Sequence, residues 1–374
     1  MLESWLISVA PESQDIATDE KPEKREGSLL WGHGGILVHP SGNFPMLDAL
    51  SVACLNEPPR IDRWLTILER HLSRSESVSV WGMIGWSYLK YLNRAEPVRA
   101  QSFLDRLFHA YPAMLGRPEV VFLMANLQHW ITAENAQRWL ALMANSGGYG
   151  QQGFGEVLMW RHALFPEEQW PREQIAALLS TVAPATQEQR VGIAHAVAHL
   201  WLEPTHRILA HGYLLRLLES TEANILNALG AIFLADSLLL DSPTRELLDA
   251  LCLHPMLLNK QSANRLSEHL EAMVVFEPER VARLANVLLD QVGEALGNLS
   301  TSWYLSTESL LDIALALQDM GEPHRTAGVA LFERMLEFNL PQAQEMTITL
   351  DKRTPMRGAV PLARRRKRKT HKSA

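Results

Sequence analysis

The residues best suited to chemistry in this chain are two histidines, His195 and His199, which lie four positions apart. A helix would bring both imidazoles to one face, and neutral imidazole is the commonest side-chain ligand of metals. His206 and His211 follow closely, so this segment could supply several ligands. The helical zinc-protease motif, however, needs a glutamate directly after its first histidine, and Ala196 stands there. We therefore predict histidines packed between helices, with no metal or cofactor, and keep a metal site on His195 and His199 as the alternative.

Two glycine-rich stretches could contact anions. The stretch Gly147–Gly155 could present backbone N–H groups to a phosphate at a helix start. The chain has no G-x-x-x-x-G-K-[ST] motif, so a loop between closely packed helices is the favoured interpretation. The stretch Trp31–Gly35 is similar to an oxyanion-hole loop, but no G-x-S-x-G motif supplies a nucleophile. We predict no catalytic residue and expect a protein that is not an enzyme.

The C-terminal tail carries the sharpest charge signal. Residues 352–374 contain ten Lys or Arg and no Asp or Glu, which leaves a formal charge of −17 on the rest of the chain. Six of these cations are consecutive: Arg364, Arg365, Arg366, Lys367, Arg368 and Lys369. Such a run predicts binding to nucleic acid or another polyanion, with steep salt dependence and no base-sequence specificity, lost on truncation after Asp351. A solvated tail with no specific role is the alternative.

A recurring phrase indicates the elements that would position these residues. It consists of an acidic or hydroxyl residue, a proline and an arginine two or three places on. Proline is tolerated at the first helical position and the preceding oxygen can accept orphan N–H groups, so each phrase predicts a helix start. Pro58 and Pro97 lie 39 residues apart, as do Pro204 and Pro243, which is the spacing of two-helix repeats. The phrases begin at Glu57, Glu96, Glu203, Ser242, Glu277 and Glu322.

The hydrophobic pattern predicts an all-α protein. About sixteen helices are expected between residues 46 and 350 from periodicity and cap signals. We predict a HEAT- or TPR-like α-solenoid of stacked helix pairs over residues 28–350, with an irregular cap at its N-terminal end. Residues 1–27 are predicted to be an N-terminal segment with a charged disordered linker, and residues 351–374 a basic disordered tail.

Apolar residues at helical spacing predict which helix faces are buried. Ile208, Leu215 and Leu218 form one such stripe, and His211 falls on it. A second stripe comprises Val281, Leu284, Leu288 and Val292. Eight of the eleven tryptophans lie in the range Trp64–Trp201, where core packing is favoured over a groove for a partner. The last helix is predicted to begin near Pro341 and to end before Pro355.

Bulk properties are those of an ordinary globular protein, with 374 residues, 47% hydrophobic and 21% charged. No apolar run approaches the roughly 18 residues that a membrane span needs. Glu3 replaces the basic start of a secretory signal, so a cytoplasmic protein is expected. Cys54 and Cys252 sit in apolar contexts and are predicted to be buried free thiols.

Several stretches together resemble a known family. They are LWGHGG at 30–35, NFPMLDAL at 43–50, ILERH at 67–71, GIAHAVAHLW at 192–201 and ALFERMLE at 330–337. Over about residues 28–353 the chain resembles the C-terminal helical region of large bacterial STAND-type NTPases, a group linked to antiphage defence. The resemblance implies a sensor or scaffold region next to a nucleotide-driven switch. This sequence has no NTPase module, so ATP binding is not carried over to any residue.

We therefore expect a non-catalytic scaffold or sensor that presents a curved surface to a protein partner, with antiphage defence as the implied setting. The alternative function is association with nucleic acid through the basic tail. The sequence leaves open whether the chain acts alone or belongs to a larger NTPase.

Overall fold

The computed structural model describes residues 1–9, 27–31, 43–73, 84–147, 149–180, 184–236, 238–253, 260–297 and 308–352. Over these residues the chain forms helices, turns and no strand, which confirms the predicted all-α class. None of the helices in these ranges is both long and apolar enough to cross a bilayer. The chain divides into two compact units, residues 1–269 and 270–374, and each is described by itself. The basic run 364–369 lies outside the described residues, so its polyanion binding stays a prediction.

The first unit begins with α1 (Leu2–Ser8), which packs on α2 and α3. Leu6 of α1 is fully buried, and Glu3 forms ion pairs with Arg60 and Arg63. The elements that follow are α2 (Phe44–Leu55), a 3-10 turn (Pro58–Arg60), α3 (Ile61–Leu72), a π-helical turn (Gly85–Leu89), α5 (Lys90–Ala95), α6 (Pro97–Ala110), a 3-10 turn (Pro112–Gly116), α7 (Pro118–Leu127) and α8 (Ala133–Ala144).

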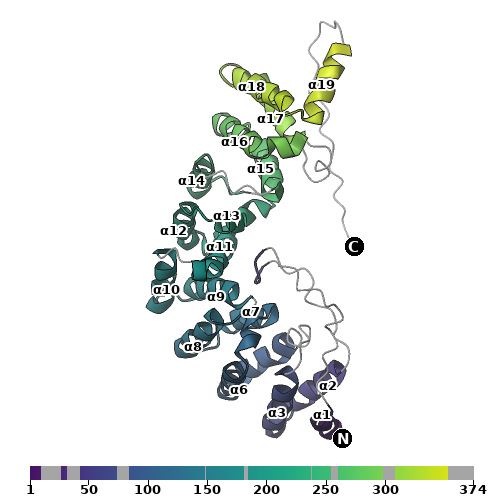
Figure 1. The fold of residues 1–374 in the computed structure, drawn as a ribbon, viewed down its shortest axis with the longest axis vertical. Helices are drawn as coiled ribbons and strands as arrows, with labels where there is room; N and C mark the ends of the chain where they lie inside the picture. The colour runs from purple at the N-terminus through teal and green to yellow at the C-terminus, as the bar shows by residue number, and fades with distance from the viewer. Residues whose placement is uncertain are drawn as a thin grey trace. The chain divides into compact units, whose positions relative to one another are not determined.

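The rest of the first unit is organised around α9 and α11, most of whose residues are buried. Its helices are α9 (Gly150–Leu164), α10 (Gln169–Ser180), α11 (Gln187–Leu202), α12 (Arg207–Leu218), α13 (Ala223–Leu229) with a 3-10 turn (Gly230–Leu234), and α14 (Ser242–Leu251). Helix α11 contacts α9, α12 and α13, whereas α9 also contacts α7 and α8. Within this unit, Figure 1 shows α8, α10, α12 and α14 along one side and α7, α9, α11 and α13 along the other.

Two glycines allow α9 and α11 to touch through their backbones. A Cβ on Gly155 would lie 2.0 Å from the carbonyl oxygen of Gln189, and one on Gly192 would lie 2.0 Å from that of Gln152. Any side chain at either position would therefore push the helices apart. This contact fixes the geometry of the two helices that carry the site described below.

The recurring phrase does mark helix starts. Each of the six copies begins within four residues before the first residue of a helix or at that residue. The predicted capping by the residue before proline is wrong at α6 and α14, and at α3, α12 and α18 the N-cap residue likewise makes no side-chain capping bond. Glu96 makes no capping hydrogen bond, since glutamate is not a favoured N-cap, and α14 is capped instead by Asp241, one residue before Ser242. Glu57 instead forms an ion pair, its Oε2 lying 3.0 Å from Nη1 of Arg60 in the same phrase.

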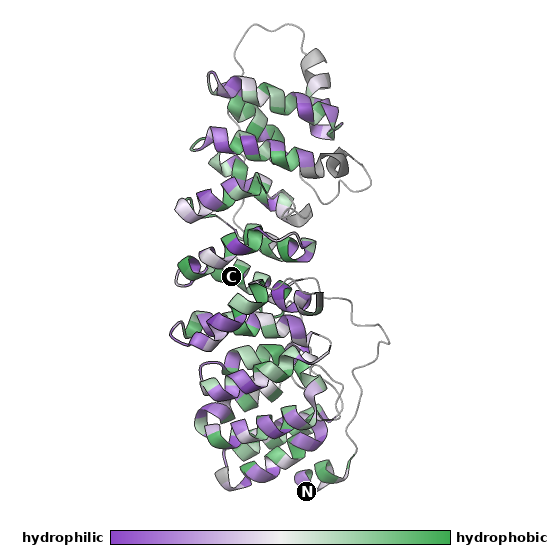
Figure 2. Ribbon diagram, turned by 60° about the vertical axis from the view of Figure 1, so that its left-hand side comes forward, coloured by the Kyte–Doolittle hydropathy of each residue, from purple (hydrophilic) through white to green (hydrophobic). Residues whose placement is uncertain are grey.

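The buried face of α12 differs from the predicted stripe. Ile208 is 87% exposed and Leu215 is 37% exposed. The residues that α12 buries are Ala210, Leu214, Leu217 and Leu218. Both sets have helical spacing, so periodicity alone could not separate them. The packing of α12 on α11 selects the set that contains Ala210. Most helices nonetheless show a hydrophobic and a hydrophilic face (Figure 2).

Three of the described tryptophans are fully buried, in agreement with the favoured core interpretation. They are Trp64, Trp139 and Trp201. Trp130 is 41% exposed and lies under the guanidinium of Arg94, whose Cζ is 5.3 Å from the ring centroid. Both cysteines are free thiols, but only Cys54 is buried as predicted, because Cys252 at the end of α14 is partly exposed.

The second unit is helical as well. Its elements are the end of α15 (Lys260–Met273), α16 (Pro278–Gly297), α17 (Glu308–Asp319), α18 (His324–Glu337) and α19 (Pro341–Lys352). Helix α18 packs on α16 and α17. Val281, Leu284 and Leu288 of the predicted stripe are buried. Helix α19 begins at Pro341, where the last helix was predicted to start, and the described residues end at Lys352.

Candidate functional site

Residues 27–31 form a turn that one buried carboxylate holds on α9. Ser28 Oγ donates to Glu156 Oε2 at 2.7 Å, and the backbone N–H groups of Leu29 and Leu30 donate to the same carboxylate at 2.9 and 3.0 Å. Gln152 Nε2 donates both to Glu156 Oε1, at 2.9 Å, and to the carbonyl oxygen of residue 27, at 2.8 Å. The Glu156 side chain of α9 thus binds a segment about 127 positions away in the sequence, mainly through the backbone N–H groups of that segment.

The turn is shaped to present these donors. Ser28 Oγ accepts hydrogen bonds from the N–H groups of Leu30 and Trp31, both at 3.1 Å. Gly27 has a φ of +126°, a conformation that favours glycine. The successive N–H groups therefore converge on one point, which is the arrangement that binds anions.

Glu156 lies in an environment that is unusual for a carboxylate, since its side chain is fully buried. Burial raises the pKa of Glu156, although the donors from Leu29, Ser28 and Gln152 oppose this effect. An isolated buried carboxylate would cost several kcal/mol, so these donors are what allow α9 to carry one. The bound turn and the buried carboxylate each depend on the other.

The aromatic end of the turn lies between α9 and α11. The ring of Trp31 stacks on His199 with centroids 5.0 Å apart and an interplanar angle of 16°. The same ring meets Trp160 edge-to-face, with centroids 6.0 Å apart. Trp160 in turn meets His206, just before α12, with centroids 5.9 Å apart. Side chains from α9, α11 and the start of α12 therefore form one aromatic surface under Trp31.

The two histidines singled out in the sequence do lie on α11, but in different surroundings. His199 is the stacking partner of Trp31. His195 is buried, and burial followed by the nearby charge of His199 lowers the pKa of His195 to about 4. Among the described residues, Nδ1 of His195 has no hydrogen-bond partner, so this histidine is packed between helices as predicted but with one ring nitrogen unpaired. Over the residues that the structure describes, no group of three or more His, Cys, Asp or Glu could hold a metal ion.

The glycine-rich stretch at 147–155 lies partly inside α9, which begins at Gly150. A Cβ on Gly153 would lie 2.4 Å from Cγ2 of Val121 on α7, and Gly155 faces α11. These two glycines make room for neighbouring helices, in line with the predicted close packing, but the predicted loop is wrong for them because both lie within α9. Of the stretch 31–35, only Trp31 falls within the described residues.

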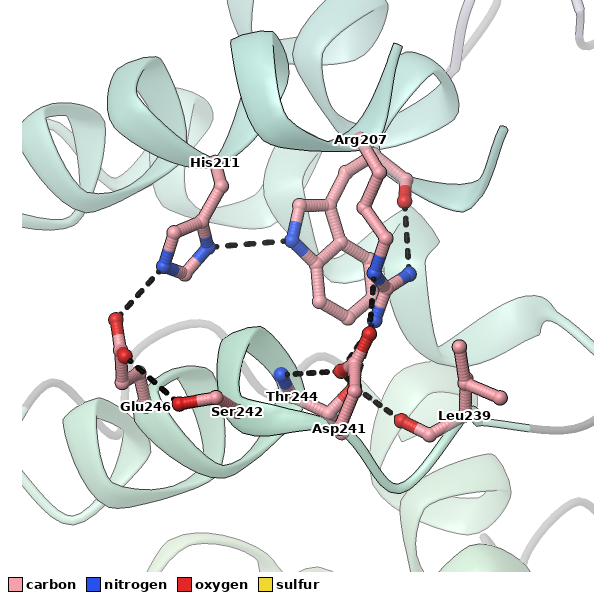
Figure 3. Close-up of polar contacts among 8 residues, drawn as sticks. Arg207, His211, Leu239, Asp241, Ser242, Thr244 and Glu246 are labelled. Atoms are coloured by element: carbon pink, nitrogen blue, oxygen red, sulfur yellow. Dashed lines mark hydrogen bonds and ion pairs between the residues drawn. The ribbon is translucent and has the colours of Figure 1, made fainter. Parts of the chain in front are cut away.

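Arg207 joins α12 to α11 and α14 (Figure 3). Its guanidinium forms a bidentate pair with Asp241, with distances of 3.0 and 3.1 Å, and donates to Thr244 Oγ1 at 2.7 Å. It also donates to the carbonyl oxygen of Trp201 at 2.9 Å and lies over that indole, 3.7 Å from the ring centroid. Because Arg207 ends one copy of the recurring phrase and Asp241 directly precedes the next, this pair links one predicted repeat to the next.

His211 adds further hydrogen bonds between α11, α12 and α14. Trp201 Nε1 donates to His211 Nδ1 at 3.3 Å, so Nε2 is the donor to Glu246 Oε2 at 2.8 Å (Figure 3). Ser242 Oγ donates to the other oxygen of Glu246 at 3.2 Å. A nucleophilic serine needs the imidazole in contact with its hydroxyl, whereas here the carboxylate lies between the two. The set therefore lacks the order of a catalytic triad and serves to connect α12 with α14.

The stability that the Arg207–Asp241 pair contributes depends on pH in the acid range, and this dependence can be measured. Burial alone would raise the pKa of Asp241, but hydrogen bonds from Arg207 and the N–H of Thr244 outweigh it, so the pKa is lowered. The stabilisation is therefore present above the unfolded-state value near 3.8 and is lost as the pH falls through the lower folded value. We expect Asp241→Asn to cost about 1–2 kcal/mol at pH 7 and progressively less toward pH 3. Urea titrations at several pH values measure this, and a cost that does not change with pH would contradict it.

Comparisons of this chain with protein-family models, with curated proteins and with solved structures find no match. Sequence reasoning missed Glu156, the residue that organises the site. The signal available was a lone carboxylate in the otherwise apolar and glycine-rich run Gly153–Met159, which a buried helix tolerates only with dedicated donors.

Proposed function

We propose that this chain is a HEAT- or TPR-like helical-repeat scaffold that binds a protein partner without catalysis, and that the surface over α9 and α11 is its binding face. The observation that carries the proposal is the capture of residues 27–31 by Glu156, Trp160 and His199. Helical-repeat proteins bind extended or turn segments on the faces of their stacked helices. This surface already binds such a segment, through its backbone and one aromatic anchor.

Links between successive phrases support the repeat architecture. Arg99, in the second phrase, pairs with Asp62 just after the first, at 3.7 Å. Arg207, in the phrase that begins at Glu203, pairs at 3.0 Å with Asp241 just before the next phrase, so the arginine and the aspartate have exchanged places. Two pairs of successive phrases are thus linked by an arginine and an aspartate, which is consistent with nearest-neighbour stacking of repeats. The resemblance to STAND-type NTPases supports a sensor role, and it supports antiphage defence as the setting in which the protein acts.

The proposal is tested by photo-crosslinking in cells that naturally make the protein. A photo-reactive phenylalanine analogue replaces His206, which touches Trp160 at the edge of the aromatic surface. The matched control places it at Val98 on α6, which is 79% exposed. We expect a discrete heavier product from position 206, identified by mass spectrometry as one partner protein, that position 98 does not give. Products at 206 that contain only this chain, or identical products at both positions, would contradict the proposal.

A further inference from the structure

We propose that Gln152, Glu156, Trp160 and His199 form a receptor for one kind of peptide turn, and that the chain's own residues 27–31 occupy it as an internal ligand. The turn has a hydroxyl residue first, two apolar residues next and an aromatic residue fourth. A partner protein that carries the same turn displaces the internal one. The inference rests on the proposed function and names the chemistry of its partner.

The contacts define what the receptor recognises. Glu156 accepts two consecutive backbone N–H groups, so proline is excluded at the second and third positions. Ser28 bonds both to the carboxylate and to the turn's own N–H groups, so the first position needs a hydroxyl. Leu29 and Leu30 are 4% and 7% exposed, so the second and third positions of the turn need apolar residues. The Trp31 ring packs against Trp160 and His199, so the fourth position needs an aromatic residue.

The residue before the hydroxyl is also specified. Gly27 has positive φ, and its carbonyl oxygen accepts from Gln152. A Cβ there would meet none of the described atoms within 4 Å, so the positive φ is the reason for glycine at this position. The complete recognition sequence is therefore glycine, hydroxyl, apolar, apolar, aromatic.

A tethered ligand has a high effective concentration, so a free peptide competes poorly until the internal turn is weakened. The test uses the full chain with Ser28→Ala and Trp31→Ala together, which leaves every receptor residue in place. A fluorescent peptide of residues 24–34 is titrated and its anisotropy measured, after circular dichroism has shown that the variant is helical. We expect saturable binding at least tenfold tighter than to the unmodified chain.

Two controls identify the receptor. A peptide with the same serine and tryptophan replaced by alanine is expected to bind at least tenfold more weakly. Adding Glu156→Gln to the double variant is expected to cause a similar loss, because the amide keeps the shape but has one acceptor oxygen in place of two. The inference is overturned if the affinity is unchanged by the alanine replacements in the peptide or by Glu156→Gln in the chain. It is also overturned if a folded double variant shows no saturable binding.

A second variant keeps the test decisive if the double variant does not fold. Gly27→Ala strains only the backbone of the internal turn, so the helices remain intact and the peptide is expected to bind at least threefold tighter than to the unmodified chain. Equal affinity for the two overturns the inference. If the peptide does not bind but a partner is crosslinked at position 206, the turn receptor is wrong and the proposed scaffold function is retained. If the peptide binds but no partner is crosslinked, the turn receptor is retained and the proposed scaffold function is wrong.

Discussion

Replacing Gly192 by alanine is expected to lower the free energy of unfolding by about 3 kcal/mol, at the upper end of the usual cost of overpacking. The added Cβ would lie 2.0 Å from the carbonyl oxygen of Gln152 and 3.0 Å from the backbone nitrogen of Glu156. Both obstacles are backbone atoms, so no side-chain rotation can relieve them and α9 must move away from α11. Urea unfolding followed by circular dichroism measures the loss. The same displacement should release the turn at residues 27–31, because its carboxylate moves with α9.

The matched control is Gly212, which lies in the exposed part of α12, where an added Cβ would meet nothing within 4 Å. Gly212→Ala replaces a poor helix former with the best one, so it is expected to raise stability by up to about 1 kcal/mol. The two substitutions are chemically identical and should have opposite signs. A similar small effect at both positions would show that α9 and α11 do not approach as closely as described.

Removing Glu168 is expected to cost about 3–5 kcal/mol, because it leaves a buried guanidinium without its counter-charge. Arg161 on α9 is 2% exposed, and its Nε and Nη2 donate to the two oxygens of Glu168 at 2.8 and 2.5 Å. Its Nη1 donates to the carbonyl oxygen of Gln128 at 2.8 Å, and its guanidinium lies 4.1 Å from the ring centroid of Phe165. After Glu168→Ala these groups would still bury the cation. Urea unfolding again measures the change.

A surface ion pair provides the control for this substitution. Arg265 and Glu268 on α15 are 2.9 Å apart, but their side chains are 45% and 40% exposed. Glu268→Ala is expected to cost less than about 1 kcal/mol, since solvent screens such pairs. Comparable losses at the two glutamates would mean that Arg161 is solvated after all.

The local features of the fold were predictable from the sequence. The proline phrases marked the helix starts, and the last helix begins at Pro341 as expected. Helix α16 buries Val281, Leu284 and Leu288 of its predicted stripe. These signals work because helix initiation and periodicity depend on residues within about four positions of one another.

The candidate site was only partly predictable. His199 was predicted to pack between helices, with a metal site as the alternative, and in the structure it stacks on Trp31. Glu156 was missed because its partners, Ser28 and Leu29, lie more than a hundred positions away. Nothing in the local sequence indicates that a glutamate directly after a glycine will bind a distant turn.

The sequence by itself determined that this protein is all-α, where many of its helices begin, and that its C-terminal end is strongly basic. Only the tertiary structure decided that Ile208 faces outward and that Gly155 and Gly192 bring two backbones together. It also decided that Glu156 binds the turn at residues 27–31. The physical reason is range, because capping and periodicity act within one or two helical turns, whereas burial depends on which distant surfaces pack together.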